Sequence, residues 1–291
     1  MLDFSPEALE RLHPLFLVLS AVMGGMIGSF LNVCIYRMPA GLSVVKPASR
    51  CPKCENGIAW YDNIPVLSWL ILGAKCRHCK NPISWRYPLI EAITAALFLG
   101  VYIKFGAVIA TPVYMILAAS LVVVTFVDLD DMTIPNEITM PGMPIGLAFS
   151  VLAMMVTGTG LLLDDPLMSI IGLFLGGGVL YGLDLVSLVV FKKRGMGFGD
   201  VKLLAMLGAF FGVKGALLIL VLAAFFGSII GISVIAISRK QTVITDDDGE
   251  ENVGYYLPFG PYIVLGGLVY MFAGPELIEW YLGMMKISGG V

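Results

Sequence analysis

Residues 203–237 read LLAMLGAFFGVKGALLILVLAAFFGSIIGISVIAI and contain a single charged residue, Lys214. A run this long and this apolar is typical of membrane-spanning helices, which need about 20 consecutive apolar residues. Gly212, Lys214 and Gly215 interrupt the run, so we expect a tight hairpin of two spans, 201–213 and 215–237, rather than one long helix. The first span is short, which is tolerable where protein or water surrounds its end.

The rest of the chain has the same character. Residues of the set AVILMFWYC make up 58% of it, and charged residues only 13%, where soluble domains carry about 25%. This composition excludes a soluble enzyme and a disordered chain, and a net charge of −3 argues against a nucleic-acid partner. We therefore predict an all-α polytopic protein of the lipid bilayer with about eight transmembrane helices. The expected spans are about 14–36, 87–103, 109–127, 138–157, 167–191, 201–213, 215–237 and 257–273.

Lysine and arginine set the expected orientation, because cytoplasmic loops carry an excess of both. With the N-terminus outside, 14 of the 18 fall on the cytoplasmic side, including clusters at 37–86 and 192–194. The chain then divides into a periplasmic N-terminus with the first transmembrane helix (1–36), a small cytoplasmic domain (37–86) and a membrane domain (87–291).

The cytoplasmic loop contains two C-x-x-C pairs, Cys51 with Cys54 and Cys76 with Cys79, separated by 21 residues. Two such knuckles place four thiolates around a tetrahedral metal, and this spacing is typical of structural zinc sites. Two disulfides or a redox role are alternatives, although cytoplasmic thiols stay reduced, and His78 could compete as a ligand. We expect these four cysteines to bind a structural Zn²⁺.

Aspartates stand at the cytoplasmic ends of two expected spans. Asp128 lies in the stretch VDLDDMTIPN (127–136), and Asp200 follows two glycines in GFGD (197–200). Charged residues beside apolar spans are costly and usually functional. Two carboxyl groups that share a site can divide acid and base work, because like charges close together cannot both ionise.

Other interpretations of these aspartates remain open from the residues alone. Asp128 and Asp200 could be interfacial helix caps or ion-pair partners of Lys202 and Arg194. They could also belong to the proton or cation path of an ion-coupled transporter, to which Asp184, deep in an expected span, would contribute. Many transporters show inverted repeats, and none is evident here.

Four motifs together resemble those of the bacterial prepilin peptidases, or type IV leader peptidases, a family of aspartic membrane proteases. They are GSFLNV (28–33) with YRMP (36–39), the four-cysteine loop with NIPVLSW (63–69) between its knuckles, Asp128 with Pro135-Asn136 after it, and GFGD (197–200). The resemblance extends over about residues 20–265 and is specific because the motifs occur together and in order.

The resemblance implies a function and a site. Asp128 and Asp200 match the two catalytic aspartates, whereas the neighbouring Asp130 and Asp131 do not. Members of the family sit in the bacterial inner membrane and cut the basic leader from type IV prepilins and type II secretion pseudopilins, after a glycine at the cytoplasmic face. Forms with four cysteines also N-methylate the new N-terminal residue with S-adenosylmethionine. Glu91 and Arg37, near the mouths of two spans, are the candidates for binding this donor.

Overall fold

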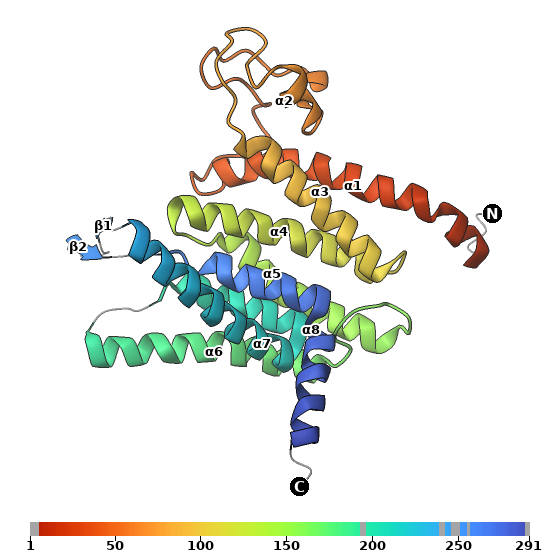
Figure 1. Cartoon of the computed structure of the whole chain (residues 1–291), viewed down its shortest axis with the longest axis vertical. Coiled ribbons are helices and arrows are strands. Elements are labelled where there is room, and N and C mark those ends of the chain that lie inside the picture. Colours follow the sequence, from red (N-terminus) through yellow and green to blue (C-terminus); the bar gives the residue numbers. More distant parts are fainter. Residues whose placement is uncertain (1–5, 193–195, 239–241, 246–250, 255–256, 289–291) are drawn as a thin grey trace. The chain divides into compact units, whose positions relative to one another are not determined.

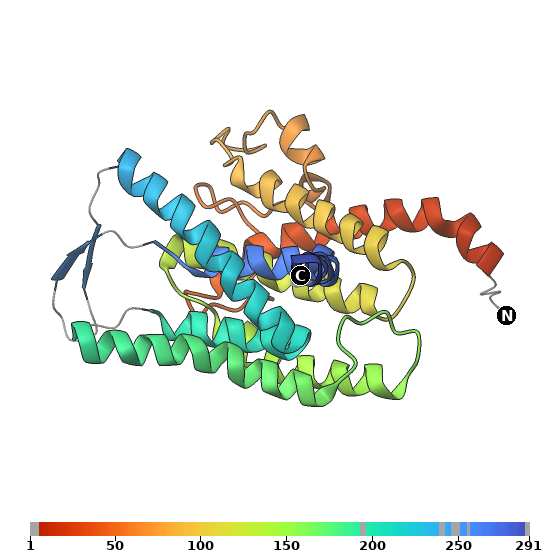
Figure 2. The same ribbon diagram turned by 60° about the horizontal axis from the view of Figure 1, so that its bottom comes forward.

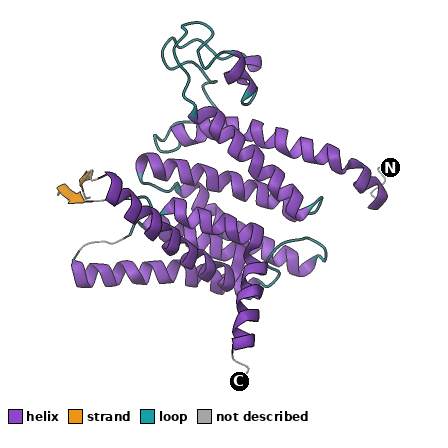
Figure 3. Cartoon of the chain, in the orientation of Figure 1, coloured by secondary structure: helices purple, strands orange, loops and turns teal. Residues whose placement is uncertain are grey.

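A computed structural model describes residues 6–192, 196–238, 242–245, 251–254 and 257–288, so that Lys193 and Arg194 of the predicted basic cluster lie outside the described residues. The regular elements of the described part are all helices apart from one short two-stranded hairpin, and loops connect them (Figure 3). In chain order (Figure 1) the elements are α1 (Pro6–Arg37), the 3-10 helix η1 (Trp60–Asn63), α2 (Leu67–Ile71), α3 (Arg86–Phe105), α4 (Ala110–Asp131), α5 (Asn136–Met155), α6 (Pro166–Phe191), α7 (Phe198–Ser238), β1 (Thr242–Thr245), β2 (Glu251–Gly254) and α8 (Gly260–Ser288).

Seven helices of the described chain are long and apolar enough to cross a membrane, namely α1 and α3 to α8. This confirms the predicted polytopic membrane fold. The predicted interruption also occurs, because Gly212 breaks the helical geometry of α7 with φ 69° and ψ −168°. Backbone at positive φ favours glycine, which has no Cβ to clash. The two predicted spans 201–213 and 215–237 are therefore the two limbs of α7.

The chain forms two compact units, Met1–Val127 with Met155–Leu161, and Asp128–Met154 with Leu162–Val291. In the first unit, α1 packs along α3 at glycines. A Cβ at Gly28 would lie 2.7 Å from the Cα of Glu91. Asn32 of α1 donates from its amide to the carbonyl oxygen of Tyr87 in α3 (3.3 Å). These contacts join the two helices on either side of the cysteine loop.

In the second unit, the two limbs of α7 have different partners. The first limb packs on α6, where a Cβ at Gly172 would lie 2.4 Å from the carbonyl oxygen of Gly208. The second limb packs on α8, where a Cβ at Gly266 would lie 2.9 Å from the carbonyl oxygen of Ile219. Near the end of this limb, Gly231 faces Leu257, just before α8 begins. The bend at Gly212 thus returns the chain toward the start of α8.

The short hairpin was not expected from the sequence. β1 and β2 pair antiparallel, with Thr242 opposite Gly254 and Thr245 opposite Glu251. The hairpin lies in the connection from α7 to α8 (Figure 2). The division of the chain at residues 36 and 86 stays a prediction, since α1 and the cysteine loop belong to the same compact unit.

Candidate active site and metal centre

Asp128 lies in the last turn of α4 and is buried, with 4% of its surface exposed. Its Oδ2 accepts a hydrogen bond from the backbone N–H of Gly260, the first residue of α8, at 3.0 Å. A Cβ at position 260 would lie only 2.6 Å from the same oxygen. The carboxylate is therefore held directly against the start of a helix that lies far along the chain.

Asp200 lies in the first turn of α7 and is also buried, with 8% of its surface exposed. Its backbone N–H donates to the carbonyl oxygen of Gly197 (3.1 Å), which closes the turn before the helix. Its Oδ1 is buried and has no hydrogen-bond partner among the described residues. Buried polar atoms in proteins are nearly always paired, so an unpaired carboxyl oxygen calls for a functional explanation.

The two aspartates come from distant motifs, and Ile134 connects their surroundings. A Cβ at Gly199 would lie 2.9 Å from the Cβ of Ile134, and one at Gly260 would lie 3.2 Å from the Cδ1 of the same side chain. Asp128 and Asp200 also interact electrostatically. The end of α4, the start of α7 and the start of α8 therefore meet at one place, and both predicted carboxylates lie there.

The other acidic residues of these motifs lie differently. Asp130 and Asp131 are exposed, although Asp128 in the same turn is buried. Asp184 in α6 accepts a hydrogen bond from the backbone N–H of Met196 (3.3 Å), just before the GFGD motif. Asp184 therefore contributes to fixing the chain that leads into α7.

The four predicted zinc ligands gather at one point. Their sulfur atoms all lie within 4.8 Å of one another, with Cys51 Sγ 3.8 Å from Cys79 Sγ and Cys54 Sγ 4.0 Å from Cys76 Sγ. Disulfide bonds are only about 2.05 Å long. A tetrahedral zinc with Zn–S bonds of about 2.3 Å places its sulfurs about 3.8 Å apart. The spacing therefore fits a four-thiolate metal centre and not two disulfides.

The two knuckles repeat the same backbone hydrogen bonds. The N–H of Cys51 donates to the carbonyl oxygen of Asn56 at 3.0 Å, and that of Cys76 donates to Asn81 at 2.8 Å. Backbone N–H groups of Cys54 and Lys53 lower the pKa of the Cys51 thiol to about 6. Those of Cys79 and His78 lower the pKa of Cys76 in the same way. Each knuckle thus stabilises the thiolate form of its first cysteine, the form that binds metal, whereas burial and the neighbouring thiols raise the pKa of Cys54 to about 11.

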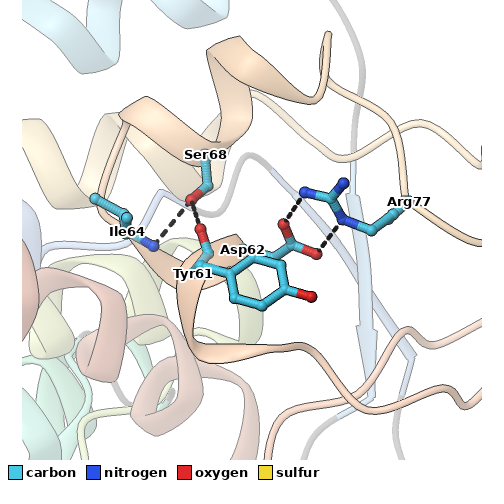
Figure 4. A network of polar contacts seen from close by, with 5 residues as sticks. All are labelled: Tyr61, Asp62, Ile64, Ser68 and Arg77. Carbon is cyan, nitrogen blue, oxygen red and sulfur yellow. Dashed lines mark hydrogen bonds and ion pairs between the residues drawn. The ribbon is translucent and has the colours of Figure 1, made fainter.

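The segment between the knuckles forms its own polar network (Figure 4). The Ser68 hydroxyl donates to the carbonyl oxygen of Tyr61 (3.0 Å) and accepts from the N–H of Ile64 (2.9 Å). The guanidinium of Arg77 donates two hydrogen bonds to the carboxylate of Asp62, from Nε to Oδ2 at 2.8 Å and from Nη2 to Oδ1 at 2.5 Å. The hydrogen bonds from Arg77 hold the pKa of Asp62 below its ordinary value. The pair ties η1 to the second knuckle.

The predicted donor-site residues lie at the two ends of this loop. Arg37, at the end of α1, donates to the carbonyl oxygens of Ser43 and Pro47, both at 2.9 Å. Glu91 of α3 is buried, with 8% of its surface exposed, and its Oε2 accepts from the N–H of Val66 at 2.7 Å. Val66 has φ 60°, a strained conformation for a β-branched residue. Both side chains therefore hold the loop in its conformation.

Fold and site together define a multi-pass membrane protein with two buried aspartates at helix ends. Comparison with known proteins gives the family. The model of the type IV leader peptidase family matches residues 115–232, and that of the bacterial peptidase A24 N-terminal domain matches residues 22–105. The chain belongs to the type IV leader peptidase family and is a membrane peptidase, as its motifs predicted.

Curated relatives agree with this assignment. A protein of Myxococcus xanthus is 38% identical over 83% of this chain and 70% of its own length, and one of Aeromonas hydrophila is 34% identical over 88% and 90%. A third, from Pseudomonas putida, is 32% identical over 94% and 95%. All three are named prepilin leader peptidase/N-methyltransferase. No solved structure matched the chain. These findings favour the predicted enzyme, and nothing favours the transporter alternative.

Sequence reasoning missed two residues at the aspartate site. Gly260 contacts Asp128 directly, and Ile134 lies against Gly199 and Gly260, but neither residue has a side chain that could take part in acid–base chemistry. A weak signal for Gly260 was present, since Gly260-Pro261 follows Pro258-Phe259 directly before an apolar run. Such a stretch marks a helix start, but only the fold shows which carboxylate it faces.

Proposed function

We propose that this chain removes the basic leader from type IV prepilins and from pseudopilins of type II secretion, cutting after a glycine, with Asp128 and Asp200 as its catalytic dyad. The observation that carries the proposal is the meeting of two buried carboxylates from separate motifs at one place. The shared name of the relatives, prepilin leader peptidase/N-methyltransferase, supports the same substrate class.

The dyad accounts for hydrolysis without a further reagent. Two carboxyl groups close together share one proton, because both cannot be charged at once. The charged carboxylate takes a proton from a water molecule while the oxygen of that water attacks the peptide carbonyl carbon. The neutral carboxyl group protonates the carbonyl oxygen. The carbon–nitrogen bond then breaks as the leaving amine gains a proton.

We place the site at the cytoplasmic face of the bacterial inner membrane. Both aspartates lie at ends of apolar helices, and the lysine and arginine bias puts those ends on the inner side. A prepilin presents its leader in the cytosol and its apolar helix in the bilayer. Its scissile bond therefore reaches the depth at which Asp128 and Asp200 lie.

We propose a structural Zn²⁺ bound by Cys51, Cys54, Cys76 and Cys79. The close set of four sulfurs supports it, as do the backbone N–H groups that stabilise the thiolates of Cys51 and Cys76. When bound, the metal cross-links the two knuckles and contributes to folding of the loop. Hydrolysis uses carboxylates from another part of the chain and needs no metal at the scissile bond.

We further propose that the enzyme methylates the new N-terminal residue, with S-adenosylmethionine as donor and Arg37 and Glu91 as its binding residues. The donor supplies a methyl group on a sulfonium cation, which a carboxylate or an aromatic face attracts. Glu91 offers the carboxylate, and the exposed Trp60 and Trp85 offer aromatic faces. The substrate amine, with an ordinary pKa of about 7.7–8.0, must be neutral to attack the methyl group.

One experiment tests both activities. Purified protein in detergent is incubated with a full-length prepilin, with and without S-adenosylmethionine, and the products are weighed by mass spectrometry. We expect leader loss in both samples and one added methyl only with the donor. A prepilin in which the glycine before the cut is replaced should stay intact. An intact wild-type prepilin after long incubation would refute the proposal.

A further inference from the structure

We propose that Gly260 is a positioning residue of the active site: its N–H fixes Asp128 as the charged, proton-accepting partner and leaves the shared proton on Asp200. The inference rests on the proposed function and deepens it by giving each aspartate its role. It follows from the hydrogen bonds of the two carboxyl groups and from the space around Gly260.

The first step is the direction of the bond between Gly260 and Asp128. A backbone N–H can only donate, so Asp128 Oδ2 accepts this hydrogen bond at 3.0 Å, and the bond is stronger when the carboxyl group is charged. Gly260 is the first residue of α8, where free N–H groups and the helix dipole favour a negative charge. Both effects favour the charged form of Asp128.

The second step is the state of Asp200, whose carboxyl group interacts with the backbone of Gly197 but keeps one oxygen without a partner among the described residues. Its Oδ1 is buried and finds no donor anywhere in the described part of the chain. A charged oxygen left in that state would be strongly destabilised, whereas a protonated oxygen needs no donor and can itself donate. The shared proton is therefore placed on Asp200.

These two protonation states assign the proton transfers of peptide hydrolysis to particular aspartates. Asp128 accepts a proton from water as the water oxygen bonds to the peptide carbon. Asp200 gives its proton to the carbonyl oxygen, which forms a neutral tetrahedral intermediate. As the carbon–nitrogen bond breaks, the amine takes the proton from Asp128, and Asp200 regains its own from the collapsing hydroxyl group. All protons are accounted for, and both aspartates return to their starting states.

The third step is the requirement for glycine at position 260. The backbone of Gly260 is helical and not at positive φ, so the backbone conformation alone does not require glycine. A Cβ at this position, however, would lie 2.6 Å from Asp128 Oδ2 and 3.2 Å from Ile134 Cδ1. The first distance is impossible for a real contact, so the carboxylate would have to move away from the N–H. The second requires only a small shift of a flexible side chain.

The main test is Gly260→Ala, compared with Gly283→Ala in the same helix, where an added Cβ meets nothing within 4 Å. We expect Gly260→Ala to lower kcat for prepilin cleavage at least tenfold with KM within about twofold, because the substrate still binds. Methylation of a pre-cleaved pilin should be unchanged if the wild-type enzyme performs it. Gly283→Ala should cleave normally. Normal cleavage by Gly260→Ala would overturn the inference while leaving the proposed function intact.

A second variant separates positioning from packing. Ile134→Val removes the Cδ1 atom that the new methyl group would touch, but leaves the clash with Asp128. We expect Gly260→Ala/Ile134→Val to remain as slow as Gly260→Ala. Recovery of kcat in the double variant would show that packing against Ile134, and not the carboxylate, was the cause, and would overturn the inference.

Infrared difference spectra between each variant and the wild type, recorded on purified enzyme near neutral pH, show which aspartate carries the proton. A protonated carboxyl group has a carbonyl stretch that a carboxylate lacks. We expect this band to disappear in Asp200→Asn and to persist in Asp128→Asn. The opposite pattern would place the proton on Asp128 and contradict the assigned roles. Wild-type enzyme that fails to cleave any prepilin would instead refute the proposed function itself.

Discussion

Lys202 donates a hydrogen bond from its ammonium group to the side-chain oxygen of Asn136. This contact joins Asn136, the first residue of α5 and the last of the Asp128 motif, to the start of α7, two residues after Asp200. The same ammonium group lies 5.2 Å from the centre of the Phe198 ring. The segments that carry the two aspartates are thus tied together beside the dyad by a charged side chain.

The first prediction concerns this tie. Asn136→Ala and Lys202→Met should each slow prepilin cleavage, and the double variant should be little slower than the singles, because both remove the same contact. Contacting residues of this kind show interaction energies of about 0.5–3 kcal/mol in double-mutant cycles. Lys214→Met, which removes an exposed lysine of the same helix, is the matched control. Fully additive effects would mean that the contact does not serve the dyad.

The second prediction concerns the metal centre. Fresh, reduced protein should contain one zinc per chain by elemental analysis, and Cys51→Ser/Cys76→Ser should contain none. Zinc contributes on the order of 10 kcal/mol to the folding of small zinc peptides, so the variant loop should exchange its amide hydrogens faster. Cys34→Ser, which removes the buried thiol of α1, should keep its zinc. Protein without metal, or an undisturbed loop in the double variant, would contradict the prediction.

The third prediction separates the two roles of Glu91. Glu91→Gln keeps an oxygen that can accept from Val66, but it removes the charge that would attract a sulfonium donor. We expect this variant to cleave prepilin normally and to lose methylation of a pre-cleaved pilin. Glu91→Ala should in addition loosen the loop, since an unpaired buried N–H costs about 1–3 kcal/mol.

The matched control for Glu91→Gln is Glu279→Gln, which changes an exposed glutamate of α8. It should leave both reactions unchanged. Full methylation by Glu91→Gln would show that Glu91 holds the loop in its conformation but does not bind the methyl donor.

The fourth prediction follows from the pair of Asp62 and Arg77. Because the pKa of Asp62 is lower in the folded loop than in the unfolded chain, the pair stabilises the loop at pH values above the ordinary value of about 3.9. The contribution is lost only as the pH falls through the lowered pKa. At pH 7, Asp62→Asn and Arg77→Met should each increase hydrogen exchange in residues 60–68, and the double variant should resemble either single.

Glu55→Gln, which changes an exposed acid of the same loop, serves as the control for this pair. Its exchange should match the wild type. The increase in hydrogen exchange caused by Asp62→Asn should become smaller at pH values below the ordinary pKa of aspartate. An increase that became larger there would contradict the prediction.

Much of the architecture could be predicted because its causes are local in the sequence. The apolar runs define the membrane helices, and Gly212 marks the bend of α7 because a residue without Cβ tolerates φ 69°. The spacing of the cysteine pairs likewise predicts four sulfurs at one point. In each case, the residues that decide the structure also carry a recognisable pattern.

The rest depends on contacts between distant segments. Gly260 faces Asp128, and Ile134 lies against both Gly199 and Gly260, yet no periodicity or composition connects these positions. The bond from Val66 to Glu91 could not be foreseen either, since it joins a loop residue with positive φ to a helix that begins after the second knuckle. Such contacts are set by packing, which the linear pattern does not encode.

The central claim is that Asp128 and Asp200 perform the hydrolysis together, and the cleavage rate of single variants tests it most directly. Asp128→Asn, Asp200→Asn and the exposed neighbours Asp130→Asn and Asp131→Asn are purified in detergent and incubated with prepilin, and leader loss is followed by mass spectrometry. We predict that the first two variants lose cleavage by at least a thousandfold while inserting normally into the membrane, and that the two neighbours retain substantial activity. Near-normal cleavage by either Asp128→Asn or Asp200→Asn would contradict the account.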